Sequence, residues 1–407
     1  MNICIVSTST PLHRQGGTEL QADSLARLAA ARGHRVFWVT TAHPEGIETE
    51  ERPGIRIYYL KGTSYRMSRA EAPAWWTASA AKLSRLCEEE RIDAVWAENF
   101  AGLSYAAIPR AERKPVISIV NGLAVRGEIA SNFNRVSSAR ELFYFLTRYA
   151  AQTLFYYIPR FRAMVRDSDL LVGVSRETTA ALEREFPASA AKFRTIFNPV
   201  DTALFRPDAE LRKAARAEFG FTGENKVLLM AGILHKQKGL HVGLEAFSRL
   251  RQASPSARLL IVGDGPELPA LKAAAAEPGL SGAVSFAGAR RNGEMPFIYN
   301  GADIYLNPTM RMEGLGLVTV EAMACGLPSV VSKIGGTAST ITDGISGFFV
   351  PPGDAEALAA KAALLLNDSP LAAAMGAAAR ARAVSEFSGS NIDRYLELSR
   401  ELARIKE

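Results

Sequence analysis

The sequence predicts an α/β fold with two Rossmann-like domains, each built on a parallel sheet. Short β-branched runs alternate with helical stretches from end to end, the pattern of stacked βα units. The alternation breaks near Phe197–Asp201 and starts again at Lys226. At 407 residues and 48% hydrophobic content, the chain can bury two cores. We therefore expect domains at 1–200 and 201–388, followed by a C-terminal helix within 389–407.

Six strands are expected in the first half, with helices between most of them. The first helix should run from about Thr18 to Ala31, because Arg32 and Gly33 are ordinary stop signals. The expected strands are Asn2–Ser7, Arg35–Thr41, Ile55–Leu60, Ala94–Glu98, Val116–Val120 and Leu170–Ser175.

The second half continues the alternation. Ligands of open α/β sheets bind outside the carboxyl ends of the strands, so functional residues are expected in the loops that follow them. Residues 391–406 have the pattern of an amphipathic helix. The expected strands are Val227–Gly232, Arg258–Gly263, Val284–Gly288, Asp303–Asn307, Ser329–Ser332 and Phe348–Val350.

Composition excludes several classes of protein. Three scattered cysteines, Cys4, Cys87 and Cys325, are too few for a disulfide framework and favour buried thiols in a reducing cytoplasm. The net charge of +6 favours anionic partners, but no zinc finger, RNA-binding strand motif or basic tail predicts nucleic acid as one. No apolar run approaches the roughly 20 residues that span a bilayer. The first residues lack a basic region and a cleavable small-residue site, so a leader is not expected. A cytoplasmic protein, soluble or peripheral, is expected.

The most informative segment runs from Glu313 to Glu321, between an expected strand and the helix-forming run Leu317–Ala324. Gly314 and Gly316 let the backbone approach a ligand, and amides at a helix N-terminus favour an anion. Carboxylates beside a phosphate would repel it, so they are expected to face hydroxyl groups. A diphosphate between two polyols, as in a sugar nucleotide, fits this pattern. The structural alternative is acids that compensate a helix dipole.

The Glu-x7-Glu pattern resembles the signature of retaining GT-B glycosyltransferases of the family 4 type, and the resemblance spans nearly the whole chain. It implies two Rossmann-like domains facing each other across a cleft, with the C-terminal helix packed back on the first. It also implies that Glu313 contacts hydroxyls of the donor sugar and that Glu321 holds the ribose. The amides expected to reach the phosphates or the transferred sugar are those of Gly314, Leu315, Gly316 and Leu317.

Two further segments match the same family. Gly263-Asp-Gly265-Pro-Glu closes an apolar strand, and together with Arg290 it would line the nucleobase pocket, where main-chain atoms read the base. A strand-to-helix turn needs glycines anyway, so a purely structural role is an equal alternative. Gly16 and Gly17 follow the first strand, and their amides would cap the diphosphate from the opposite wall of the cleft. A flexible turn is the alternative there.

Two positions depart from the family pattern. Where the family has Gly-Arg-Leu followed by Lys-Gly, this chain keeps Lys238 but has Ile233 in place of the arginine. A bidentate phosphate contact is thereby lost, unless His235 or Lys236 substitutes for it. Asn121 stands where many relatives have a histidine that binds the donor sugar. Its amide can donate a hydrogen bond but cannot transfer a proton.

Residues 125–166 carry seven arginines and two glutamates among nine aromatic residues. In relatives the equivalent region helps to form the acceptor site. Cationic, aromatic helices also lie on anionic membrane surfaces, so a lipid-linked acceptor at the inner face of the membrane is one interpretation. The other is an amphipathic helix packed into the domain. Trp75 and Trp76 lie in a helical stretch, where core packing is more frequent than sugar stacking.

The resemblance therefore implies a retaining transferase that moves a hexose or N-acetylhexosamine from a UDP- or GDP-sugar to a carbohydrate or lipid acceptor, in glycan or glycolipid biosynthesis. Glu313, Lys238 and Asn121 would be the catalytic groups. No metal is expected, because no suitable loop carries the Asp-x-Asp arrangement of metal-dependent transferases. The alternatives are a non-catalytic sugar-nucleotide-binding partner subunit, an epimerase of the same fold, and a nicotinamide-dependent oxidoreductase. The oxidoreductase is disfavoured, because this chain lacks the Gly-x-Gly-x-x-Gly motif after its first expected strand.

Overall fold

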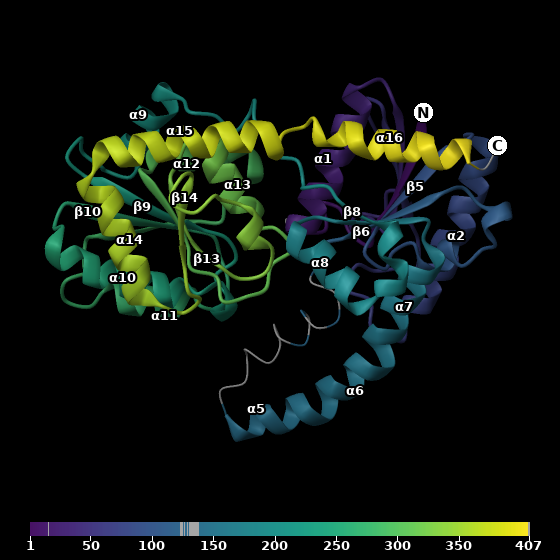
Figure 1. The fold of residues 1–407 in the computed structure, drawn as a ribbon, viewed down its shortest axis with the longest axis horizontal. Helices are drawn as coiled ribbons and strands as arrows, with labels where there is room; N and C mark the ends of the chain where they lie inside the picture. Colours follow the sequence, from purple (N-terminus) through teal and green to yellow (C-terminus); the bar gives the residue numbers. More distant parts are fainter. Residues whose placement is uncertain (15, 123–124, 126, 128, 130–137, 406–407) are drawn as a thin grey trace. The chain divides into compact units, whose positions relative to one another are not determined.

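The computed structural model describes residues 1–14, 16–122, 125, 127, 129 and 138–405 (Figure 1). The chain divides into two compact units. Unit 1 comprises Met1–Pro199 and Gly389–Glu407, and unit 2 comprises Val200–Ser388. Each unit contains one sheet with helices packed on it, which confirms the predicted α/β class.

Unit 1 contains an eight-stranded sheet in the order β3-β4-β2-β1-β5-β6-β7-β8. All neighbouring strands are parallel except the edge pair β3 and β4. The central strands are apolar and buried, as expected for a parallel sheet covered on both faces. The strands are β1 (Asn2–Val6), β2 (Arg35–Thr41), β3 (Thr49–Arg52), β4 (Ile55–Leu60), β5 (Ala94–Glu98), β6 (Val116–Val120), β7 (Leu170–Gly173) and β8 (Phe193–Thr195).

The helices of unit 1 include α16, which joins it from the far end of the sequence. Trp96 Nε1 in β5 donates to Ser399 Oγ in α16 at 2.9 Å, and Arg32 pairs with Asp393 at 2.5 Å. The helices are α1 (Gly17–Ala31), α2 (Ala72–Glu89), α3 (Leu103–Ala106), α5 (Ala139–Tyr144), α6 (Ala150–Gln152), α7 (Ile158–Asp167), α8 (Arg176–Glu185) and α16 (Asn391–Arg404).

Residues 139–157 of unit 1 form a helical arm that extends away from the sheet (Figure 1). Two π-helical turns, η2 (Phe145–Tyr149) and η3 (Thr153–Tyr157), alternate with α5 and α6 and continue into α7. We call residues 139–157 the α5–α6 arm. The neighbouring residues 126, 128 and 130–137 of the arginine-rich segment lie outside the described residues.

Unit 2 contains a six-stranded, entirely parallel sheet in the order β11-β10-β9-β12-β13-β14. The strands are β9 (Lys226–Ala231), β10 (Ala257–Val262), β11 (Val284–Gly288), β12 (Ile304–Asn307), β13 (Ser329–Ser332) and β14 (Gly347–Val350). The helices are α9 (Ala209–Glu218), α10 (Leu240–Ala253), α11 (Leu268–Ala275), α12 (Met295–Gly301), α13 (Leu317–Ala324), α14 (Ala355–Asn367) and α15 (Ser369–Glu386).

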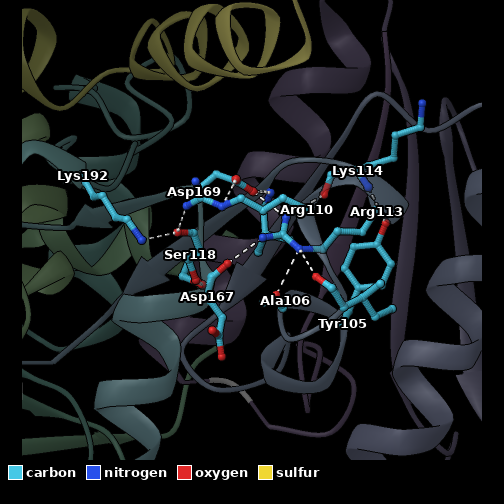
Figure 2. A network of polar contacts seen from close by, with 12 residues as sticks. Tyr105, Ala106, Arg110, Arg113, Lys114, Ser118, Asp167, Asp169 and Lys192 are labelled. Carbon is cyan, nitrogen blue, oxygen red and sulfur yellow. Dashed lines mark hydrogen bonds and ion pairs between the residues drawn. The ribbon is translucent and has the colours of Figure 1, made fainter. Parts of the chain in front are cut away.

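The amino ends of β6 and β7 are tied together by a buried guanidinium (Figure 2). Arg113 is 5% exposed, donates to the carbonyls of Ala106 and Ile108, and pairs with Asp169 at 2.5 Å. Lys192 donates to three carbonyls at the end of α7, at 2.8 to 3.0 Å. Because this network lies at the amino ends of the strands, it stabilises the sheet at the edge opposite to the one where ligands bind.

In the part of the chain that the structure describes, no single helix is long and apolar enough to cross a membrane. Ala355–Asn367 and Ser369–Arg404, bent by 105° at their junction, meet those criteria only as a pair. Much of this pair is core, since α14 and α15 bury Leu358, Leu365 and Met375.

Candidate functional site

Each sheet has one point at which the strand order reverses beside its first strand. In unit 2 this point lies between β9 and β12, and in unit 1 between β1 and β5. Ligands of open α/β sheets bind outside the carboxyl ends of the strands at such a point. The loop after β9 carries Lys238 and the loop after β12 carries Glu313, whereas β5 ends at Glu98. Candidate residues in both units therefore gather at the expected edge.

Lys238 and Glu313 form an ion pair. Lys238 Nζ lies 2.7 Å from Glu313 Oε1, and the two side chains are 25% and 12% exposed. Burial alone would raise the pKa of Glu313, but the Lys238 ammonium, a hydrogen bond from Thr309 and the charge of Arg311 hold it below the usual value. An ionised carboxylate and a cation thus stand side by side at the switch point, where hydroxyl and phosphate groups can both be bound.

Close backbone packing explains several of the glycines in this region. Gly239 has φ 66°, and a Cβ there would lie 2.0 Å from the carbonyl oxygen of Pro308. A Cβ on Gly263 would lie 1.8 Å from the oxygen of Gly232, and one on Gly265 would lie 2.4 Å from a main-chain oxygen. The structural role that the sequence left open for Gly263 and Gly265 therefore has a physical basis. Their contact with a nucleobase remains a prediction.

The loop from Glu313 to Leu317 starts α13, as the sequence predicts. Gly316 has φ 91°, which favours glycine, and Leu315 is 2% exposed. The Glu313 carbonyl accepts a hydrogen bond from Gly336 N at 2.8 Å, which fixes the start of the loop. No side chain of the described residues caps α13 at Gly316, so the positive end of the helix dipole is compensated by no local cap.

Glu321 is held within unit 2 by two side chains, Asn292 and Tyr299, that no sequence motif indicates. Asn292 Nδ2 donates to Glu321 Oε1 at 3.0 Å, and the Tyr299 hydroxyl donates to Oε2 at 2.8 Å. Glu321 is 6% exposed, and burial raises its pKa to about 7 although both hydrogen bonds favour the ionised form. Nearby, the side chain of Arg290 pairs with Glu218 at 2.9 Å.

Ile233, which replaces the family's arginine, and the two candidate substitutes His235 and Lys236 differ in their surroundings. His235 Nδ1 accepts a hydrogen bond from Gln237 N at 3.3 Å and caps the short 3-10 helix Lys236–Lys238. Lys236 is exposed, and Ile233 is 44% exposed. The imidazole of His235 is thus engaged in a hydrogen bond with the main chain. Of the two candidates to replace the missing arginine, Lys236 is the one whose side chain is more available to a ligand.

In unit 1, Asn121 is positioned by the end of β5. Its Nδ2 donates to Glu98 Oε2 at 2.5 Å, and its main-chain N–H donates to Asn99 Oδ1 at 3.0 Å. Asn99 adopts φ 49°, a left-handed conformation that asparagine tolerates. Glu98 is 4% exposed; burial raises its pKa to about 8, partly opposed by the Asn121 amide and reinforced by the charge of Glu19. Glu98 was missed, although a carboxylate ending a buried strand is itself a signal.

Gly16 and Gly17 lie at the start of α1, with Gly16 as the N-cap. A Cβ on Gly16 would lie 2.4 Å from Glu19 Oε2, and the Ser9 hydroxyl donates to Glu19 Oε1 at 2.6 Å. A carboxylate therefore already compensates this helix N-terminus, which is the role that the sequence gave to a phosphate. The contact of Gly16 and Gly17 with a diphosphate remains a prediction.

A cavity of about 540 Å³ lies at the amino ends of β9 and β12 in unit 2, lined by Asp208, Arg212 and Asp303 among others, far from Lys238 and Glu313. Among the described residues, no group of three or more His, Cys, Asp or Glu side chains could hold a metal ion.

Comparisons with known proteins agree with the fold. The model for the glycosyl transferases group 1 matches residues 212–382, and the model for glycosyltransferase family 4 matches residues 15–204. The structure resembles that of Anabaena HepE in complex with UDP and glucose, with a TM-score of 0.72 at 20% identity over 98% of this chain and 99% of that one. The fold is therefore that of the GT-B glycosyltransferases. Within this class the chain belongs to the family 4 type.

Relatives of known activity match this chain to different extents. A GDP-mannose-dependent alpha-(1-6)-phosphatidylinositol monomannoside mannosyltransferase from Mycolicibacterium smegmatis is 34% identical over 225 residues, which is 54% of this chain and 58% of that protein. The match thus spans little more than half of that relative. An N-acetyl-alpha-D-glucosaminyl L-malate synthase from Bacillus anthracis is 24% identical over 93% of this chain and 91% of its own length.

Proposed function

We propose that this protein is a retaining glycosyltransferase that moves a hexose or N-acetylhexosamine from a nucleoside diphosphate sugar to an acceptor hydroxyl. The observation that carries the proposal is the Lys238–Glu313 ion pair at the switch point of unit 2, beside the uncapped start of α13. A cation and helix amides suit a departing diphosphate, and an ionised carboxylate suits sugar hydroxyls.

Each side chain has a role in this mechanism. Glu313 accepts hydrogen bonds from the hydroxyls of the donor sugar and orients its anomeric carbon. Glu321, held by Asn292 and Tyr299, accepts from the ribose. Lys238 and the first amides of α13 stabilise the charge that develops on the leaving diphosphate, so lysine supplies the positive charge that a metal supplies in other transferases. Asn121, oriented by Glu98, donates to the sugar or acceptor.

The relatives support the classes of substrate. One is named as GDP-mannose-dependent, and HepE is described with UDP and glucose, so a GDP- or UDP-sugar is the proposed donor. The named acceptors of the relatives are a phosphatidylinositol monomannoside and L-malate. We propose a carbohydrate or lipid-linked acceptor in glycan or glycolipid biosynthesis.

A position on the inner face of a membrane is part of this proposal. The α5–α6 arm supports it, because six large hydrophobic side chains are exposed along a fourteen-residue stretch of this arm. They are Leu142, Phe143, Tyr144, Leu146, Leu154 and Phe155, which are 37 to 75% exposed. Arg140 and Arg148 are exposed on the same arm. Apolar rings combined with cations suit the boundary of an anionic bilayer.

The decisive experiment screens the purified protein against UDP-, GDP-, ADP- and dTDP-sugars by thermal shift and by sugar release. We expect one base family to raise the melting temperature and its sugar to be released slowly, with release abolished in Glu313→Ala. Unchanged release in Glu313→Ala would refute the proposed role of this carboxylate. Stabilisation without release, and without transfer to any acceptor in a broad panel, would favour the alternative of a non-catalytic sugar-nucleotide-binding subunit.

A further inference from the structure

Unit 2 contains a second cavity, at the edge of its sheet opposite to Lys238 and Glu313. It lies at the amino ends of β9 and β12, and its volume of about 540 Å³ falls within the range of about 300 to 1,000 Å³ that is typical of ligand pockets. Its walls come from α9, the starts of β9 and β12, the turn between α13 and β13, and the junction of α14 and α15. The proposed transferase function makes no use of this cavity.

Much of the lining is aliphatic. Ile304, Leu327, Leu365 and Leu366 contribute side chains that are 1 to 7% exposed. A hydrocarbon group in the cavity would therefore exchange water for apolar contacts. The lining residues that the structure describes include no aromatic side chain, so a nucleobase or a sugar ring finds no stacking surface there.

The two carboxylates of the lining are already compensated. Asp303 pairs with Arg212 at 2.5 Å and with Arg216 at 3.3 Å. Asp208 caps α9 and accepts two main-chain hydrogen bonds at the start of that helix. These acceptors have partners within the protein, so the cavity offers little to a cationic ligand.

Lys226 supplies an uncompensated positive charge in the same lining. Among the described residues, no carboxylate pairs with its ammonium, and its polar contact is the Ser369 hydroxyl at 3.5 Å. An ammonium and a hydroxyl side by side can both donate to one anionic group, and a charge-assisted contact is the stronger kind of hydrogen bond. The cavity therefore combines an aliphatic lining with one site for an anion.

Two elements connect this cavity to Glu321. Cys325, which lines the cavity, donates its N–H to the Glu321 carbonyl oxygen at 3.0 Å, one turn further along α13. Asn300, which also lines the cavity, follows Tyr299, whose hydroxyl donates to the Glu321 carboxylate at 2.8 Å. A ligand that packs against this lining therefore restrains both the helix that carries Glu321 and the side chain that holds its carboxylate.

We propose that this cavity is an effector site for an apolar anion, a hydrocarbon group that carries one carboxylate or phosphate. The anionic group binds Lys226 and Ser369, and the bound effector raises the affinity of the donor site. The same chemistry occurs in a free fatty acid and in an alkyl phosphate. Because linkage is reciprocal, a bound donor raises the affinity for the effector by the same factor. The regulatory part rests on the proposed function, whereas the binding part does not.

The test of binding is calorimetric titration of the 407-residue chain with octanoate and with octyl phosphate, below the concentrations at which they form micelles. Octanol carries the chain without the charge, and acetate and inorganic phosphate carry the charge without the chain. We expect octanoate, octyl phosphate or both to bind about tenfold more tightly than every control. The tighter of the two identifies the anionic group. Failure of both to bind, or equal binding of octanol, would overturn the inference.

Matched variants identify the site. Lys226→Met should reduce the affinity for the anion about tenfold, to that of octanol, whereas Lys213→Met, at an exposed lysine of α9 outside the lining, should leave it unchanged. Ala373→Leu adds bulk to an exposed alanine of the lining and should weaken binding. Ala374→Leu changes the next exposed residue of α15, which lies outside the lining, and should not. Equal effects within either pair would mean that the anion binds elsewhere.

Nucleotide affinity tests the regulatory part. We expect UDP or GDP to bind at least about fivefold more tightly when the cavity is saturated with octanoate or octyl phosphate, and this gain should disappear in Lys226→Met. Binding of the anion without any change in nucleotide affinity would overturn the effector role. If no nucleotide binds under either condition, the proposed transferase function fails, while the titrations of wild type and Lys226→Met still decide whether the cavity binds an apolar anion.

Discussion

The Lys238 ammonium and the Glu313 carboxylate, 2.7 Å apart, join the loops that follow β9 and β12. These strands are neighbours in the sheet although the two residues are 75 positions apart in sequence. A mostly buried ion pair of this kind stabilises little by itself, but removing one partner leaves the other uncompensated. We infer that a bound diphosphate attracts Lys238 and frees Glu313 for the sugar hydroxyls, so one pair of residues handles both charges of the donor.

Lys238→Met should abolish most of the transferase activity. It removes the cation proposed for the leaving diphosphate, a change expected to lower kcat about 100-fold. It also removes the charge that holds the pKa of Glu313 low, so the carboxyl becomes easier to protonate. Steady-state sugar release measures the effect, and Lys236→Met, at the other candidate phosphate contact on the same loop, is compared with it. If Lys236→Met were the more damaging change, Lys236 would be the phosphate contact and this assignment would fail.

Ile233→Arg should strengthen donor binding. Ile233 is 44% exposed at the position where the family has arginine, so a guanidinium can be placed there without disturbing the core. One additional charge-assisted contact to phosphate would tighten nucleotide binding about tenfold. Titration with free nucleoside diphosphate measures it. Ile345→Arg, which changes a 61% exposed isoleucine elsewhere in unit 2, should have no effect. An equal gain in both variants would indicate only a general effect of added charge.

Arg113→Met should destabilise unit 1 without altering the donor site in unit 2. Arg113 Nη1 pairs with the largely buried Asp169, and its other nitrogens donate to main-chain carbonyls. Loss of the guanidinium leaves these acceptors and the carboxylate poorly satisfied, at a cost of about 3 kcal/mol. Chemical denaturation, with the unfolding of unit 1 followed, measures this loss of stability. Arg166→Met, which removes the ion pair of an exposed arginine with Asp167, should leave stability nearly unchanged.

The sequence predicts the elements that local patterns determine better than the elements that depend on contacts between distant parts of the chain. Strands such as Arg35–Thr41 and Val116–Val120 were predicted with their observed bounds, because β-branched runs between turn signals are local patterns. β3 and β8 were not predicted. β3 is Thr-Glu-Glu-Arg, which has low strand propensity and forms by pairing with β4 at the sheet edge.

Side-chain partners were not predictable, because they depend on strand order. The glycine loops and Glu313 could be placed at strand ends from the sequence, but the adjacency of β9 and β12 that brings Lys238 to Glu313 could not. The two side chains that bind Glu321, which are Asn292 and Tyr299, could not be predicted from the sequence either. Tyr299, for example, fits the pattern of an ordinary core residue of α12.

The α5–α6 arm should bind anionic vesicles. Leu146→Ser combined with Phe155→Ser removes two side chains that are 59% and 75% exposed, and should lower partitioning into phosphatidylglycerol vesicles at least about tenfold. Because Arg148 contributes electrostatically, binding should also weaken as salt rises. Leu364→Ser, at a 49% exposed position in α14, serves as the control. Sedimentation with vesicles measures the effect, and unchanged partitioning of the double variant would exclude the arm as the contact.

Glu98→Gln should stabilise unit 1 at pH 8 more than at pH 5. Burial raises the pKa of Glu98 to about 8 in the folded protein, whereas the carboxyl of the unfolded chain ionises near 4.3. The native state therefore retains a proton that the unfolded state releases, and stability falls as the pH rises through this window, by about 5 kcal/mol in full. Glutamine has no such ionisation, and its carbonyl can still accept from Asn121.

The difference in melting temperature between Glu98→Gln and wild type should thus grow steadily from pH 5 to pH 8. Glu50→Gln is the matched control in the same unit. Burial would raise the pKa of Glu50, but hydrogen bonds from Arg52 and Tyr59 hold it below the usual value, so this carboxyl is ionised in both states across the range. A flat difference for Glu98→Gln would mean that its carboxyl is ionised in the folded protein, which would contradict the raised pKa that follows from its burial.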